Sequence, residues 1–230
     1  MQVRVGSVRG RVVQAVMLAA VLGGCSQSPD PEAKASGSPS ASDAAAKSTA
    51  AASGGSIGAA GSACQLPVSF DIARHWKAKA VDAEKEMAKT SGGSDGDVTG
   101  ALADAFLRQG PVTTACEIDA KPAGAIGFLR VWTGKPGDAD ARTVLRQFVA
   151  AEDNVSKEKY RSFTTGGGLA GVEVEYLYTS KLLEETKKES ALAVATPAGP
   201  VVLHLGGLDT KEHEAMLPAY ELAKRTLRVL

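Results

Sequence analysis

The chain has 230 residues, of which 44% are hydrophobic and 5% aromatic, and its 26 basic side chains balance its 26 acidic ones. A chain of this length holds about one domain, and balanced charge argues against the basic footprint of a nucleic-acid-binding protein. Two of its three cysteines, Cys64 and Cys116, and its three scattered histidines lack the ligand spacing of a zinc site.

The first 24 residues have the composition of an export signal. Residues 1–11 carry three arginines and no acidic residue, and residues 12–22 form an apolar run. This run is too short to span a bilayer, which takes about 20 residues, and a basic start before a short apolar segment is typical of a signal peptide. Loss of residues 1–24 would leave 23 basic and 26 acidic side chains, a formal charge of −3.

The sequence Leu22-Gly23-Gly24-Cys25 resembles the lipobox of bacterial lipoproteins, because a leucine stands three positions before a cysteine with two small residues between. The resemblance implies cleavage between Gly24 and Cys25 and a diacylglycerol thioether on Cys25. Two acyl chains hold a protein stably on a membrane, so we expect a lipid anchor on the extracytoplasmic face of the cell membrane. The alternative is ordinary secretion with Cys25 free or paired.

Residues 26–62 consist almost entirely of Ser, Ala, Gly and Pro, with Ile57 as the one large apolar residue. Such a segment cannot bury enough surface to offset the ordering of its backbone, so we expect disorder. A flexible chain of some 37 residues spans roughly 35 Å. We therefore predict a tether over residues 25–62, with a glycosylated stalk as the alternative, and a folded domain over 63–230.

The two cysteines of the expected domain are Cys64 and Cys116. Outside the cytoplasm two thiols in one domain most often form a disulfide, which we predict here. It would close a loop of about 50 residues and stabilise the fold by about 4 kcal/mol on the chain-entropy model. The sequence contains no Cys-x-x-Cys motif, which argues against a thioredoxin-type redox site.

Apolar periodicity predicts an α+β domain. Alternation with period two predicts strands over the segments 66–72 and 171–180. Strand-like composition, in part bounded by turns, predicts further strands over the segments 74–81, 113–120, 125–134, 159–163, 189–196 and 201–207. Apolar residues three and four apart, with caps, predict helices over the segments 83–89, 97–110 (capped by Asp97), 138–151 and, with Pro218 in its first turn, from about Leu217 to Leu230. This order predicts a single, mostly antiparallel sheet flanked by helices.

The segment VSFDIARHW at 68–76 resembles the opening of the PsbP/Mog1-like domain, and GVEVEYLY, VVLHLGG and LPAYELAKRTLRVL follow in the order of that fold. The whole chain is similar to exported actinobacterial lipoproteins of the LpqN/LpqT type, which carry such a domain behind a lipobox and a tether. Cys64, Cys116 and the insertion around 91–100 depart from the general pattern. The resemblance implies a scaffold for binding or assembly without shared catalytic residues, so no residue role is carried over.

Glu173 and Glu175 lie two apart on one predicted strand face, with carboxylates roughly 7 Å apart. Such a pair can act as acid and base or bind a cation, but a solvated strand face is the favoured interpretation. The histidines are His75, His204 and His213, and a metal or catalytic role needs two of them on one face. We expect His204 on the outer face, beside the two glutamates, because it is out of phase with its apolar neighbours.

Other polar or aromatic groups have a structural explanation that we favour over a functional one. The glycines 166–168 precede a strand rather than a helix, so they indicate a hairpin loop and not a phosphate cradle. Arg130 and Trp132 are expected in core and rim packing, with a cation–π contact or a groove wall as the alternative. Trp76, next to basic Arg74 and Lys77, is expected in the core rather than on an exposed binding surface.

The sequence thus predicts a membrane-anchored, non-enzymatic binding or assembly module, with no catalytic, cofactor-binding or metal residue assigned and no cofactor. The expected partner, besides the membrane, is an envelope protein, a lipid or a small molecule, met by the sheet face or by the loops at 91–100 and 164–170. The alternative is a cell-envelope hydrolase that uses acidic and histidine residues on the sheet. That alternative requires Glu173, Glu175 and a histidine around one pocket.

Overall fold

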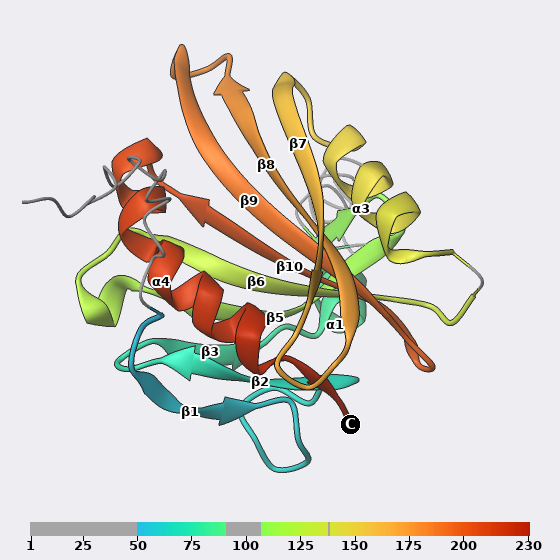
Figure 1. Ribbon diagram of the computed structural model, residues 1–230. Helices are drawn as coiled ribbons and strands as arrows, with labels where there is room; N and C mark the ends of the chain where they lie inside the picture. The colour runs from blue at the N-terminus through green and yellow to red at the C-terminus, as the bar shows by residue number, and fades with distance from the viewer. Residues whose placement is uncertain (1–49, 91–106, 138) are drawn as a thin grey trace, which may run out of the picture. The chain divides into compact units, whose positions relative to one another are not determined.

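The computed structural model describes residues 50–90, 107–137 and 139–230, which belong to one compact unit (Figure 1). The expected signal peptide, Cys25, most of the expected tether and the predicted helix cap Asp97 lie outside the described residues. Within those ranges, no helix is both long and apolar enough to cross a membrane.

The centre of the domain is an eight-stranded antiparallel sheet with the strand order β3-β5-β6-β10-β9-β8-β7, in which β4 also pairs with β5. The prediction of a single α+β domain with a mostly antiparallel sheet is therefore confirmed. The strands of this sheet are β3 (Lys77–Ala80), β4 (Arg108–Gln109), β5 (Val112–Asp119), β6 (Gly127–Gly134), β7 (Val155–Thr164), β8 (Ala170–Ser180), β9 (Glu185–Thr196) and β10 (Gly199–Gly207).

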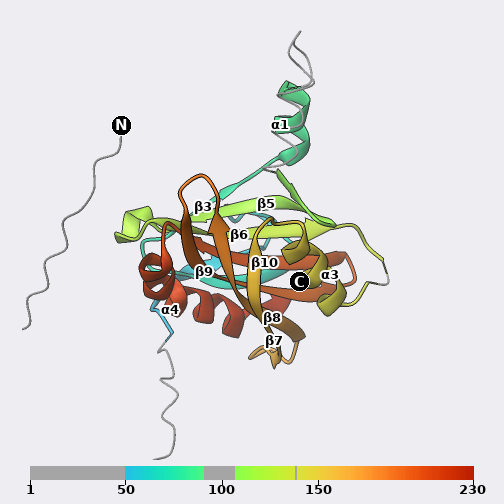
Figure 2. The ribbon, with the colours of Figure 1, turned by 90° about the horizontal axis from the view of Figure 1, so that it is seen from above.

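Different elements cover the two faces of this sheet, as Figures 1 and 2 show. On one face lie α4 (Thr210–Thr226) and a small sheet of β1 (Ser53–Ile57), β2 (Val68–Ala73) and β11 (Arg228–Val229). On the other face lies α3 (Ala141–Ala150), capped by the Asp140 carboxylate, which accepts hydrogen bonds from the backbone N–H groups of Arg142 and Thr143. Each face of the sheet therefore has its own hydrophobic core, so successive residues along the central strands are buried on alternate faces.

The remaining short elements are α1 (Ala83–Thr90) and the 3-10 turn η1 (Lys121–Ala123), which joins β5 to β6. The predicted strands, the turn at 121–124 and the first and third helices thus appear near their expected positions. The predicted helix over 97–110 differs at its end, because Arg108 and Gln109 pair with β5 as strand β4.

The predicted disulfide joins Cys64 to Cys116, with 6.0 Å between their Cα atoms. Both half-cystines are buried, at 1% and 0% exposure. Cys116 lies in the middle of β5, whereas Cys64 lies between β1 and β2. The bond therefore fastens the segment that carries the small sheet onto the large one.

The prediction of a disordered tether up to residue 62 is wrong at its end, because residues 53–57 form β1. This strand pairs antiparallel with β2, and Ile57 is 4% exposed in the core. Ahead of it, the Ala51 N–H donates to the Pro218 carbonyl at 2.9 Å. Backbone pairing and one buried side chain thus order a stretch whose composition alone resembles a linker.

The last helix begins earlier than predicted and contains Pro218 in its interior. α4 starts at Thr210 because the Asp209 carboxylate caps the Glu212 N–H, and Pro218 is its ninth residue. Proline removes one helical hydrogen bond, yet the buried face of the helix, which includes Met216 and Tyr220, holds it against the sheet. Leu230 is 61% exposed, contrary to its expected place on this face.

Candidate functional site

A groove of about 700 Å³ lies on the α3 side of the large sheet, beyond the end of that helix. Its floor comes from β6, β9 and β10, and its walls come from the β8–β9 hairpin and the residues after α3. We call it the β6–β10 groove. Its volume lies within the range of about 300–1,000 Å³ that is usual for small-molecule sites.

Strand alternation places three large side chains of β6 on the groove floor, namely Phe128, Arg130 and Trp132. Trp132 packs edge-on against Phe148 of α3 and is 3% exposed, while the Arg130 guanidinium lies 5.2 Å from the centre of the Phe128 ring. Core packing of Trp132 is therefore confirmed, whereas Arg130 forms the cation–π contact of the alternative interpretation, and both residues line the groove.

Gly206 of β10 keeps the floor open. It pairs with Phe128 of β6, and a Cβ atom added to it would lie 3.6 Å from His204 Cε1 and 3.8 Å from Glu189 Oε1. These are ordinary contact distances, so a side chain at this position would fill the groove rather than strain the backbone. The neighbouring glycine, Gly207, has no such space, because its Cβ would meet backbone at 2.8 Å.

Four polar side chains form a hydrogen-bonded cluster at the groove, centred on the Tyr176 hydroxyl. That oxygen lies 2.8 Å from Glu152 Oε2, 3.1 Å from Glu189 Oε2 and 3.2 Å from His204 Nε2. His204 Nε2 also lies 2.8 Å from Glu189 Oε2. We call these residues the Tyr176 cluster, which comprises Glu152, Tyr176, Glu189 and His204.

Lys187 completes the charge balance around Glu189. Its Nζ atom lies 2.8 Å from Glu189 Oε1 and donates to the Gly207 carbonyl at 2.8 Å, while it also lies 5.5 Å from the centre of the Tyr178 ring. Glu189 is 3% exposed, so both of its oxygens are compensated inside the protein. A buried carboxylate is tolerated only with such partners.

The two carboxyl groups of the Tyr176 cluster differ in acidity because their partners differ. Burial raises the pKa of Glu189, but His204 and Lys187 outweigh it and lower the pKa to about 2. Burial and the nearby Glu189 charge raise the pKa of Glu152 above its usual value. Burial, reinforced by both carboxylates, holds the pKa of Tyr176 well above 10, so its hydroxyl remains a donor.

The mouth of the groove is apolar. Three of the large hydrophobic side chains exposed in the described ranges line it, namely Ile126 at 54%, Leu183 at 64% and Leu208 at 54%. Two of them are held together, since the Leu208 N–H donates to the Ile126 carbonyl at 3.0 Å. Exposed apolar groups gathered around a concave site are typical of a binding surface.

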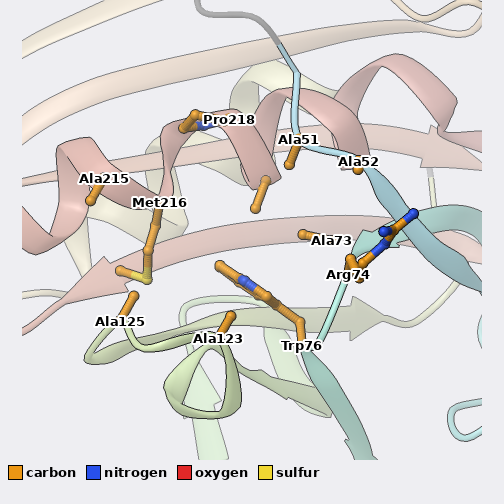
Figure 3. Close-up of a pocket in the computed structure, with 11 residues that line it drawn as sticks. Ala51, Ala52, Ala73, Arg74, Trp76, Ala123, Ala125, Ala215, Met216 and Pro218 are labelled. Atoms are coloured by element: carbon orange, nitrogen blue, oxygen red, sulfur yellow. The ribbon is translucent and has the colours of Figure 1, made fainter.

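A second, smaller cavity of about 200 Å³ lies under α4 (Figure 3). Met216 reaches from the helix toward Ala125, and the Trp76 ring lies across the same space, with alanines as most of the remaining lining. Trp76 is 9% exposed, as expected for a core residue, and the cavity is below the size usual for ligand sites. We therefore regard it as a packing defect at the edge of the core.

Glu173 and Glu175 lie on the opposite face from the groove. Arg161 of β7 forms ion pairs with both of them, and Lys224 Nζ of α4 lies 2.8 Å from Glu173 Oε2. Charged partners thus engage both carboxylates on the α4 side of the sheet. The favoured structural interpretation of this pair is consistent with these contacts.

The expectation for His204 is wrong. Its row in the sheet contains Val174, Ala191 and Arg130, so it faces α3 and not the side of Glu173. That face is covered as well, and His204 is 8% exposed, with its ring 5.5 Å from Phe148. Because α3 lies on this face, a residue out of phase with one core falls into the other.

The other predicted positions do not converge on the groove. His213 lies on the buried face of α4, with Nε2 3.1 Å from Ser190 Oγ, and His75 is an exposed turn residue with a φ of 70°. The glycines 166–168 form the β7–β8 hairpin loop, as expected. The loop expected at 91–100 lies outside the described residues.

Sequence reasoning missed Glu152, Tyr176, Lys187 and Glu189 as a group. The sequence could have indicated the pair of Glu189 and His204. The turn of the hairpin that joins β9 to β10 sets His204 opposite Ala191. Residues two apart on a strand share a face, so this register places Glu189 beside His204.

Comparison with known proteins adds a family and a loose structural likeness. The family described as an uncharacterised lipoprotein matches residues 34–227. The chain is similar to the solution structure of cyanobacterial PsbP (CyanoP) from Synechocystis sp. PCC 6803, with 11% identity and a TM-score of 0.45 over 76% of this chain and 98% of that one. That likeness concerns the chain path alone, and no residue role passes from it.

No curated protein matches the sequence. The family match, by contrast, spans most of the chain, including all the strands and helices described above except β11. The chain therefore belongs to the uncharacterised lipoprotein family.

Proposed function

We propose that the protein is exported, cut between Gly24 and Cys25, and lipidated at Cys25 on the extracytoplasmic face of the cell membrane. Membership of a lipoprotein family supports a lipid anchor, and the Leu-Gly-Gly-Cys motif supports Cys25 as its site. The resemblance to LpqN/LpqT lipoproteins supports an actinobacterial, PsbP/Mog1-like member of this class. The tether in this proposal ends near residue 50, where the described domain begins.

We further propose that the anchored domain is a binding module and that the β6–β10 groove is its ligand site. The observation that carries this proposal is the combination of an open volume of about 700 Å³, an apolar mouth and a polar, hydrogen-bonded floor. Binding sites for small molecules commonly join apolar walls to a few fixed polar groups. A ligand with both an apolar part and a polar part fits this division.

The alternative of an envelope hydrolase has less support, because its residues do not meet. Glu173 and Glu175 face α4, whereas His204 faces α3. Within the described ranges, the hydroxyl bonded to His204 is that of Tyr176, whose raised pKa makes it a poor nucleophile. No serine hydroxyl or thiol there makes a hydrogen bond to His204.

Binding of N-phenyl-1-naphthylamine, a neutral aromatic probe whose fluorescence rises in apolar sites, tests the groove. We expect saturable binding to the wild-type protein and at least a tenfold loss of affinity in Gly206→Leu, whose side chain would occupy the floor. Gly167→Leu is the matched control, because a Cβ there also meets only atoms at 3.5 Å or more, away from the groove. Absence of binding, or equal binding by Gly206→Leu, would refute the groove as the site.

A further inference from the structure

The cations that line the groove are already engaged by the protein itself. Arg130 Nε lies 2.8 Å from Glu117 Oε2, and Lys187 is shared between Glu189 and the Gly207 carbonyl. Arg108, on the wall, is likewise not free. An anionic ligand would therefore compete here with carboxylates that Arg130 and Lys187 already contact.

Glu152 is in the opposite situation. Its carboxylate accepts a hydrogen bond from the Tyr176 hydroxyl, but no Lys, Arg or His nitrogen of the described residues lies within 4.0 Å of it. It lies on the groove wall directly after α3, next to exposed Asp153. The pKa of Glu152 is raised, because burial and the charge of Glu189 both disfavour its ionised form.

Aromatic rings surround the same space. Tyr178, Phe128 and Trp132 all line the groove, and Lys187 and Arg130 already lie near the faces of two of these rings. A positive group is attracted to ring faces, and the attraction grows where water is excluded. The rings of the groove thus already lie beside two positive groups, so this lining accommodates cations.

We infer that the ligand of the β6–β10 groove is an organic cation with an apolar body, whose positive group pairs with Glu152 while its apolar part contacts the mouth at Ile126, Leu183 and Leu208. This inference rests on the proposed binding function of the groove. A bound cation would give Glu152 the partner that no Lys, Arg or His of the described residues supplies, and it would leave the pairs of Arg130 and Lys187 intact.

Competition between two amphiphiles of equal chain length tests the sign of the ligand's charge. Octyltrimethylammonium and octanoate, both below their micelle concentrations, are each titrated against bound N-phenyl-1-naphthylamine at pH 7. We expect the ammonium compound to displace the probe with at least tenfold higher affinity than octanoate. Glu152→Gln, which removes the charge at nearly constant shape, should lower the affinity for the ammonium compound at least fivefold relative to the affinity for the neutral probe.

Glu214→Gln provides the control for a change in net charge, because Glu214 is an exposed residue of α4 paired with Lys188, away from the groove. It should leave both affinities unchanged. Equal or tighter binding of octanoate, or an unaltered ammonium affinity in Glu152→Gln, would overturn the inference while probe binding still upholds the groove. Failure of the neutral probe to bind would instead overturn the proposed function itself.

Discussion

At the scale of single residues, the Tyr176 hydroxyl connects the two unlike carboxyl groups of the groove. It has one proton to donate, and it lies within hydrogen-bond distance of both Glu152 and Glu189. Because His204 and Lys187 compensate Glu189, the remaining electrostatic strain falls on Glu152. Of these two carboxyl groups Glu152 is the less compensated, which is why the proposed ligand pairs with it.

The sequence shows such a cluster only in part. Glu189 follows two lysines in β9, and such a run of charged residues is typical of a solvent-exposed segment. The Glu189 side chain is nevertheless buried, at 3% exposure. Its burial depends on His204 and Tyr176, which lie 15 and 13 residues away in the chain. Hairpin register can place these side chains on one face, but it cannot show that α3 covers that face.

His213 makes the stability of the domain depend on pH. Its ring is 2% exposed, and burial lowers its pKa from 6.5 to about 4. Because the unfolded chain takes up the proton first, stability is full above pH 6.5 and falls as the pH drops toward 4, by about 3 kcal/mol in total. Urea unfolding between pH 7 and 4 should show this loss in the wild type and a smaller loss in His213→Gln.

Exposed His75 supplies the control for this measurement, since His75→Gln should keep the wild-type pH dependence. Glu189, whose pKa is lowered to about 2, weakens the fold only below about pH 4.5 and does so equally in all three chains. Parallel pH profiles for the wild type and His213→Gln would contradict the assignment.

At the scale of elements, the alternation of apolar and polar residues predicts strands whose apolar side chains are buried. It does not predict a strand that forms mainly through backbone hydrogen bonds to a neighbour. β8 shows buried Val172, Val174 and Tyr176 between more polar positions, and it forms where period two predicts it. β1 has the sequence SGGSI, and its pairing partner β2 determines its structure. Pro218 similarly argued for a late helix start, but tertiary packing of α4 outweighs one lost hydrogen bond.

Removal of β1 tests whether it belongs to the domain. A chain that begins at residue 63 loses the pairing with β2, the Ala51–Pro218 hydrogen bond and buried Ile57. Burial of one isoleucine alone contributes about 1.5–3 kcal/mol, so we expect the free energy of unfolding to fall by at least about 3 kcal/mol. Urea unfolding compares this chain with chains that begin at residues 45 and 50, which should match each other. Equal urea midpoints for all three chains would mean that residues 50–62 do not stabilise the domain and belong to the tether.

At the scale of the whole molecule, the anchor decides where the groove meets its ligand. In the proposed arrangement, the lipid at Cys25 attaches the protein to the membrane. With the domain starting near residue 50, the proposed tether would have about 25 residues and a mean reach of roughly 25–30 Å. The groove would then sample the space just beyond the lipid headgroups, where amphiphilic cations concentrate on anionic lipid.

Replacement of the lipobox cysteine tests this placement. Cys25→Ser removes the thiol that the diacylglycerol would modify, so we expect the protein to leave the membrane fraction and the added lipid mass to disappear. A second variant combines Cys25→Ser with Ser28→Cys and restores a thiol three residues outside the motif. Because lipidation requires the cysteine directly after Leu-Gly-Gly, this variant should also be released. Retention of Cys25→Ser would mean that another contact holds the protein at the membrane, and retention of the double variant alone would mean that any nearby thiol suffices.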